Sequence, residues 1–221
     1  MLDPDEWRWL EEHAAGEFDH LLIGTSLPFL LAPGLHYLES WNEAVCNGAW
    51  GGPAALAGER VRQALDLEHW AAFGSSLDRI MEMVRDVGTA DGAPASIVAL
   101  SGDVHHAYLA EVGFPRGTGM RSAVYQATCS PFRNPLDHGE RRAIRFCCSR
   151  AGTLVGKLLA RAAGVGEPPV RWRFTHDAPF FDNQVCFVET RGREAKLWLQ
   201  KTVPGENDGY SLETVFEAAL T

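Results

Sequence analysis

The segment from Ile97 to His106 limits most strongly what this chain can fold into. Its first four residues, Ile97 to Leu100, are apolar and follow a break at Pro94, and this run is too short for a helix. Two of the four are β-branched, which favours a buried strand. The run ends at Leu100, and Ser101 and Gly102 break the strand. Open α/β sheets build their ligand sites at the carboxyl ends of their strands, so we expect a functional site directly after this strand.

A carboxylate and two imidazoles occupy that position, on Asp103, His105 and His106. In an extended segment, Asp103 and His105 share one side and His106 points away. A carboxylate oxygen and an imidazole nitrogen together suit ions such as zinc, manganese or iron. The alternative is a strand-end turn that carries two surface histidines. These residues alone leave both interpretations open.

Composition excludes several classes of function. A length of 221 residues allows one sizeable core. The net charge of −9 argues against a nucleic-acid partner, because no basic patch offers contacts to several phosphates. No apolar run reaches bilayer length, so we expect no membrane partner. The first residues show no signal peptide, and the five cysteines form no C-x-x-C pair, which together predict a cytoplasmic location.

The coarse pattern predicts an α/β fold. Apolar periodicity and breakers predict helices over residues 4–15, 59–87 and 138–163 and strands over 19–24, 96–101 and 122–128, with a hairpin of 184–190 and 194–203. Prolines and glycine interrupt residues 27–38, which we expect to form an irregular loop.

Seven short segments occur together in one order. They read Trp-x-x-Leu, Ile-Gly-Thr-Ser-Leu-Pro-Phe, Glu-Ser-Trp-Asn-Glu, Leu-Glu-His-Trp-Ala-Ala-Phe, Leu-Ser-Gly-Asp-Val-His-His-Ala-Tyr, Cys-Ser-Pro-Phe-Arg-Asn-Pro-Leu and Phe-Phe-Asp-Asn-Gln. In this order the chain resembles the C-terminal half of the alkaline phosphatase D (PhoD-like) metallophosphoesterases. The resemblance implies the C-terminal half of a layered α/β/β/α sandwich over residues 1–203, followed by a polar tail over 204–221.

The resemblance also implies a reaction, the hydrolysis of a phosphate monoester or diester. Two divalent or trivalent metal ions (Ca, Fe, Mn or Zn) would activate a hydroxide that attacks phosphorus. By matching motifs, the metal ligands would be Asp103 and His105. His106 is a candidate proton donor to the leaving alcohol, with a role beside the metal ligands or a surface position as alternatives. Thr25, Ser26, Trp41 and Arg133 are candidates for lining the phosphate pocket. We expect these side chains to share a cleft at the strand ends.

The chain departs from the family in one respect. The family's other metal ligands lie on a Gly-Asp-x-x-Tyr-x-Asp segment that is absent here, so the expected partner is a missing N-terminal half of the domain. The alternative is a non-catalytic half-domain that only binds a partner. A serine hydrolase using Ser26 or Ser101 with His105 is a weaker alternative, since no Gly-x-Ser-x-Gly elbow exists.

Overall fold

The computed structural model describes residues 2–133, 135–205 and 209–221. Its elements follow in the order α1 Pro4–Ala14, β1 His20–Gly24, α2 Pro33–Cys46, α3 Gly52–Ala64, the 3₁₀ helix η1 Trp70–Ala72, α4 Gly74–Thr89, β2 Ser96–Ser101, β3 Tyr108–Gly113, β4 Ala123–Thr128, α5 His138–Cys148, α6 Arg150–Ala162, β5 Arg171–Phe174, β6 Gln184–Arg191, β7 Glu194–Pro204 and β8 Tyr210–Ala219. Mixed helices and strands with a C-terminal hairpin confirm the predicted α/β class.

The chain forms two compact units, which we describe separately. The helical unit comprises residues 29–81 and 138–169. The sheet unit comprises residues 3–28, 82–137 and 170–221.

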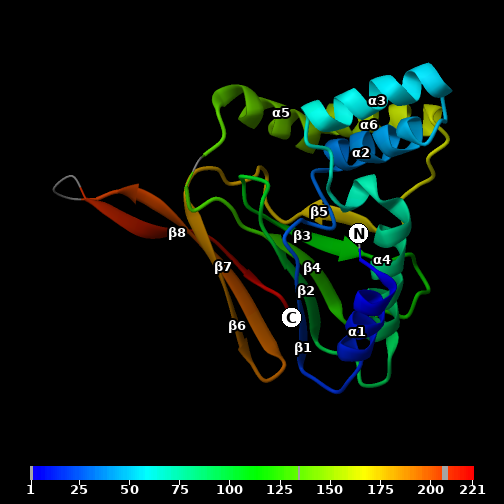
Figure 1. The fold of residues 1–221 in the computed structure, drawn as a ribbon. Coiled ribbons are helices and arrows are strands. Elements are labelled where there is room, and N and C mark those ends of the chain that lie inside the picture. Colours follow the sequence, from blue (N-terminus) through cyan, green and yellow to red (C-terminus); the bar gives the residue numbers. More distant parts are fainter. Residues whose placement is uncertain (1, 134, 206–208) are drawn as a thin grey trace. The chain divides into compact units, whose positions relative to one another are not determined.

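The sheet unit contains two sheets (Figure 1). The first has the strand order β1-β2-β4-β3-β5, in which β1, β2 and β4 run parallel and β3 pairs antiparallel with both β4 and β5. The second is the antiparallel sheet β6-β7-β8. Their shared core is the cluster Val98, Leu109, Ala127, Ala195, Leu197 and Leu220. The two sheets therefore pack face to face, because this cluster draws on β2, β3, β4 and β7.

The predicted local signals of this unit are confirmed where they depend on near neighbours. Asp3 and Glu6 form a capping box at the start of α1, in which the Asp3 carboxylate accepts from the Glu6 amide at 2.9 Å. β2 is buried over Ser96–Ala99, as the apolar run predicted. Its Ile97, on the face opposite Val98, lies close to Gly88 at the end of α4.

The last residues differ from the prediction. Residues 204–221 were expected to form a polar tail, whereas Tyr210–Ala219 is strand β8, paired with β7. Leu220 follows it and is fully buried in the shared core. Its Tyr210, Thr214, Val215 and Phe216 are residue types that favour strands.

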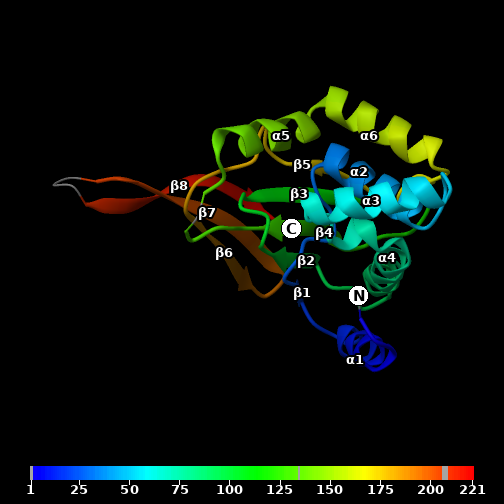
Figure 2. The ribbon, with the colours of Figure 1, turned by 45° about the horizontal axis from the view of Figure 1, so that its top comes forward.

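The helical unit packs around α2 (Figure 2). Residues 27–38 were expected to form a loop, but α2 begins at Pro33, because proline fits the first helical turn, where its missing N–H is not needed. The helical pattern predicted over 59–87 is divided into α3, η1 and α4. The predicted helix 138–163 is divided at Ser149, whose hydroxyl accepts from the Gly152 amide at 3.0 Å and so starts α6.

Candidate functional site

The carboxyl ends of β1, β2 and β4 lie at one edge of the first sheet. The strands are in register, with Gly24 opposite Leu100 and Leu100 opposite Ala127. The parallel ladder continues past their ends, since the Thr25 amide donates to Leu100 at 2.9 Å and the Cys129 amide donates to Ser101 at 3.0 Å. The three loops that follow these strands therefore begin side by side.

The loop after β2 is a tight turn held by the loop after β4. The Ser130 hydroxyl accepts from the amides of Val104 at 3.2 Å and His105 at 2.8 Å. On the other side, the Gly102 amide donates to the Ser26 carbonyl at 3.2 Å. A side-chain hydroxyl from the loop after β4 and a backbone carbonyl from the loop after β1 thus hold this turn.

Asp103 and His105 both adopt left-handed backbone conformations, with φ of 61° and 55°. The chain therefore turns here and is not extended, and the Ser130 hydroxyl holds the turn through the amides of Val104 and His105. Left-handed backbone costs about 1–2 kcal/mol for a residue with a Cβ. Strain of this kind persists only where the surroundings impose it, and it gathers at active sites and ligand clamps.

The structure brings some predicted site residues to this edge. Asp103 and Ser26 are exposed there, and His105 and Thr25 are partly buried. The Thr25 hydroxyl donates to the Leu27 carbonyl at 3.0 Å. Arg133 is exposed in the loop after β4.

Two further predicted site residues have their contacts within their own units. His106 is 1% exposed, with its Nδ1 2.6 Å from the Val104 carbonyl and its ring stacked on Tyr108. Trp41 belongs to α2 of the helical unit, where its ring meets Trp50 edge-on. The sequence showed that His106 alternates with His105, but it did not show that this places the His106 ring in the core.

A row of aromatic rings continues from His106, and the sequence analysis missed it. Tyr108 stacks on Phe174 with centroids 4.4 Å apart, and His176 lies 5.7 Å from Phe174. The Leu109 amide donates to His176 Nε2 at 3.1 Å, so Nε2 is an acceptor and the proton of the neutral ring is on Nδ1, 2.7 Å from the Ala178 carbonyl. Burial lowers the pKa of His176. This imidazole is therefore a neutral structural group.

A small cluster of polar side chains lies at the carboxyl ends of β2 and β4, and the sequence did not predict it. The Gln126 side chain is 1% exposed and donates to the Ser101 hydroxyl at 2.8 Å. The hydroxyls of Ser101 and Thr128 lie 2.9 Å apart. Alternation in β4 was the available signal, because it places Gln126 and Thr128 on the same face as each other.

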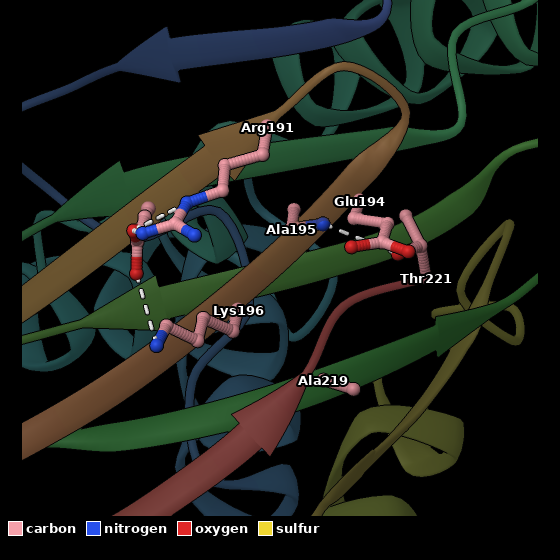
Figure 3. A pocket seen from close by; sticks show the side chains of 7 residues that line it. Arg191, Glu194, Ala195, Lys196, Ala219 and Thr221 are labelled. Carbon is pink, nitrogen blue, oxygen red and sulfur yellow. Dashed lines mark hydrogen bonds and ion pairs between the residues drawn. The ribbon is translucent and has the colours of Figure 1, made fainter.

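A pocket of about 350 Å³ lies on the second sheet (Figure 3). Glu189 forms ion pairs there with Arg191 at 2.6 Å and Lys196 at 2.9 Å. The hydrogen bond from Lys196, followed by that from Arg191, lowers the pKa of Glu189. Figure 3 shows Glu194 and Thr221 on the opposite side of this pocket. Its charged groups already neutralise one another in solvent, and we assign the candidate site to the sheet edge instead.

Replacement of Asp103 tests the backbone strain. We expect Asp103→Gly to be more stable to unfolding than Asp103→Ala by about 1 kcal/mol, because only glycine adopts this φ without cost. Urea unfolding of both variants measures the difference. Asp177 is exposed and has no positive φ; there the order should reverse, with alanine the more stable. The same order at both positions would contradict a strained turn.

No family model matches the chain. No solved structure matches it either. Among curated proteins, a 4-hydroxy-tetrahydrodipicolinate reductase of Pseudoalteromonas atlantica is 26% identical over 160 residues, covering 68% of this chain and 56% of the relative. The chain thus spans about half the length of the curated relative it matches.

This comparison corrects the expectations drawn from the resemblance. The relative bears the name of a reductase, which contradicts a PhoD-like phosphoesterase and the hydrolysis of a phosphate ester. The expected pair of metal ions is corrected with it; within residues 2–133, 135–205 and 209–221 no group of three or more His, Cys, Asp or Glu side chains is placed to hold a metal ion. The non-catalytic alternative gains no support from a relative named as an enzyme. Short motifs in the right order can match a family that the whole sequence does not.

Proposed function

We propose that this chain is part of an oxidoreductase whose substrate binds at the carboxyl edge of β1, β2 and β4. The observation that carries the location is the strained turn, in which Ser130 holds an acid and an imidazole in left-handed conformations. The similarity to a reductase supports the reaction class.

In this proposal His105 provides a proton and Asp103 provides a hydrogen-bond acceptor. Reduction of a polar double bond adds two electrons and two protons overall, and one proton goes to the atom that does not receive hydride. The imidazolium of His105 supplies that proton and becomes neutral. Asp103 accepts a hydrogen bond from a substrate N–H or O–H group. The two side chains have different roles, because His105 donates a proton and the Asp103 carboxylate only accepts a hydrogen bond.

The electron donor is not placed on this chain. A dinucleotide-binding turn has three glycines between its strand and its helix. The turn after β1 contains only Gly24 before Pro28, so its residues do not fit a dinucleotide phosphate. We propose that a part of the complete enzyme outside this chain holds the donor, in line with the 56% coverage of the relative.

Arg133 and the hydroxyls of Thr25 and Ser26 are proposed to bind a substrate carboxylate. An exposed guanidinium forms paired hydrogen bonds with a carboxylate, and hydroxyls add further donors. The relative's name includes a ring dicarboxylate, dipicolinate, which supports this ligand class.

Pyridine-2,6-dicarboxylate is therefore a suitable probe. Amide NMR titration of the full chain should show saturable shifts at Thr25, Ser26 and residues 102–106, and Arg133→Ala should weaken binding about tenfold, the typical loss for one charged hydrogen bond. Arg116→Ala is the matched control, since Arg116 follows β3 at the opposite edge of the sheet. Unsaturable shifts, or an equal loss in both variants, would refute the site.

The described residues contain no helix that is long and apolar enough to cross a membrane. We keep a cytoplasmic location as a proposal. It is supported by five free cysteines, the pattern of a reducing compartment.

A further inference from the structure

The tight turn after β2 has two anchors in other parts of the sheet unit. The first anchor is Ser130, whose hydroxyl accepts from the amides of Val104 and His105 in the middle of the turn. The second anchor is Phe180, which forms an antiparallel bridge with Ala107 at the end of the turn. In this bridge the Ala107 amide donates to the Phe180 carbonyl at 2.8 Å, and the Phe180 amide donates to the Ala107 carbonyl at 2.9 Å.

One side chain connects the two anchors. Gln184, the first residue of β6, donates from its Nε2 to the Ser130 carbonyl at 2.9 Å and to the Phe180 carbonyl at 3.2 Å. Because carbonyl oxygens only accept, both contacts require N–H donors, and the NH₂ group of this amide supplies two. The Gln184 backbone amide donates to the Pro131 carbonyl at 3.2 Å. A single residue of the second sheet thus contacts both anchors of the turn.

The surroundings of the Gln184 side chain indicate a role other than stability. The residue is 2% exposed, so water does not compete for its two N–H groups. Its Oε1 is buried too and accepts no hydrogen bond from the part of the chain that the structure describes. Burial of an unpaired oxygen costs about 1–3 kcal/mol. Departures of this kind from a satisfied core are expected at functional sites.

We propose that Gln184 is a positioning residue, which holds the two anchors together and so keeps the turn in the shape that presents His105. The left-handed backbone of His105 needs such support, because strained conformations persist only where their surroundings impose them. Ser130 also lies three residues before Arg133, so the same link fixes the start of the loop that carries this guanidinium. The inference rests on the proposed function, in which both side chains meet the substrate.

Amide hydrogen exchange of the full chain tests the link without a ligand. In Gln184→Met, which fills nearly the same space without a donor, the protection factor of the His105 amide should fall about tenfold, as for the loss of one to two hydrogen bonds. Gln184→Glu should lose less, about threefold, because a carboxyl group buried against two carbonyls stays protonated and donates one hydrogen bond. This graded order is expected of a hydrogen-bonded link and not of a packing defect.

Asn42→Leu is the matched control. The Asn42 side chain is 1% exposed, and its Nδ2 donates to the Gly58 carbonyl at 3.0 Å in the helical unit. This variant also removes a buried amide donor, and urea unfolding measures the stability that each variant loses. The protection of the His105 amide should be the same in Asn42→Leu as in wild type. An equal loss in Asn42→Leu and Gln184→Met, or unchanged protection in both Gln184 variants, would overturn the proposal.

Titration with pyridine-2,6-dicarboxylate separates this inference from the proposed function. Gln184→Met should bind the probe about fivefold more weakly than wild type, and Asn42→Leu should bind it equally well. Wild-type affinity in a Gln184→Met variant that has lost the protection of His105 would overturn the positioning role. A wild type that does not bind the probe, with the graded protection intact, would refute the proposed function and leave the link in place. If Gln184→Met does not fold, Gln184→Glu against wild type decides both measurements.

Discussion

Acidification from pH 7 to pH 5 is expected to cost the folded protein about 2 kcal/mol through the single imidazole of His36. This residue lies in α2 and is 1% exposed. Burial lowers its pKa from 6.5 to about 3. The unfolded chain therefore takes up a proton below pH 6.5 while the folded chain does not. The free energy of unfolding therefore decreases as the pH falls below 6.5. Relative to pH 7, the decrease due to His36 would reach about 3 kcal/mol at pH 4.

Urea unfolding at pH 7, 6 and 5 measures this slope. His36→Leu, of similar volume, should remove most of it, and replacement of the exposed His138 by Gln should leave it unchanged. His176 acts in the same direction, since burial lowers its pKa too. Burial raises the pKa values of Glu39 and Glu43, and these two groups act in the opposite direction. The contribution of His36 is therefore the difference between the slopes of wild type and His36→Leu. An unchanged slope in His36→Leu would refute this assignment.

Gly34→Ala should destabilise the protein by about 3 kcal/mol, the upper part of the range for overpacking. An added Cβ would lie 2.7 Å from the Cys147 carbonyl oxygen and 2.9 Å from the Gly152 carbonyl carbon. Both neighbours are backbone atoms at the junction of α5 and α6, which a rotamer change does not move. The gain in helix propensity from glycine to alanine, about 1 kcal/mol, offsets only part of this cost.

Gly166→Ala is the matched control, since an added Cβ there meets no atom within 4 Å. Chemical unfolding should place this variant within about 0.5 kcal/mol of wild type, as is usual for surface changes. A Gly34→Ala variant as stable as wild type would mean that α2 and α6 separate without cost.

The predictions that succeeded rest on near neighbours in the sequence. Helix α1, strand β2 at Ile97 to Leu100, and the hairpin of residues 184–190 and 194–203 each follow from one continuous stretch of sequence. At the site, the meeting of the loops after β1 and β2 follows from their parallel pairing, which the buried strands predicted.

The failures depend on distant partners. The turn at Asp103 is set by the hydroxyl of Ser130, 27 residues later in the chain, so local pattern suggested an extended segment. α2 was missed because Pro33 and Gly34 are read as breakers, although proline suits a first turn and the glycine meets α6. The phosphoesterase assignment rested on short motifs, whereas the comparison that contradicts it spans 160 residues.

The division of the chain between its two units limits which deletions and recombinations of the gene can leave one unit intact. From Asp3 onward the chain passes from one unit to the other after residues 28, 81, 137 and 169, so each unit is assembled from separated stretches of sequence. Neither unit is encoded by one continuous segment, and no single deletion removes one and spares the other. A protease that cuts one connection would leave the fragments joined through the remaining connections and pairings. Recombination that exchanges either unit for another would therefore require several simultaneous crossovers, and the two units are inherited together.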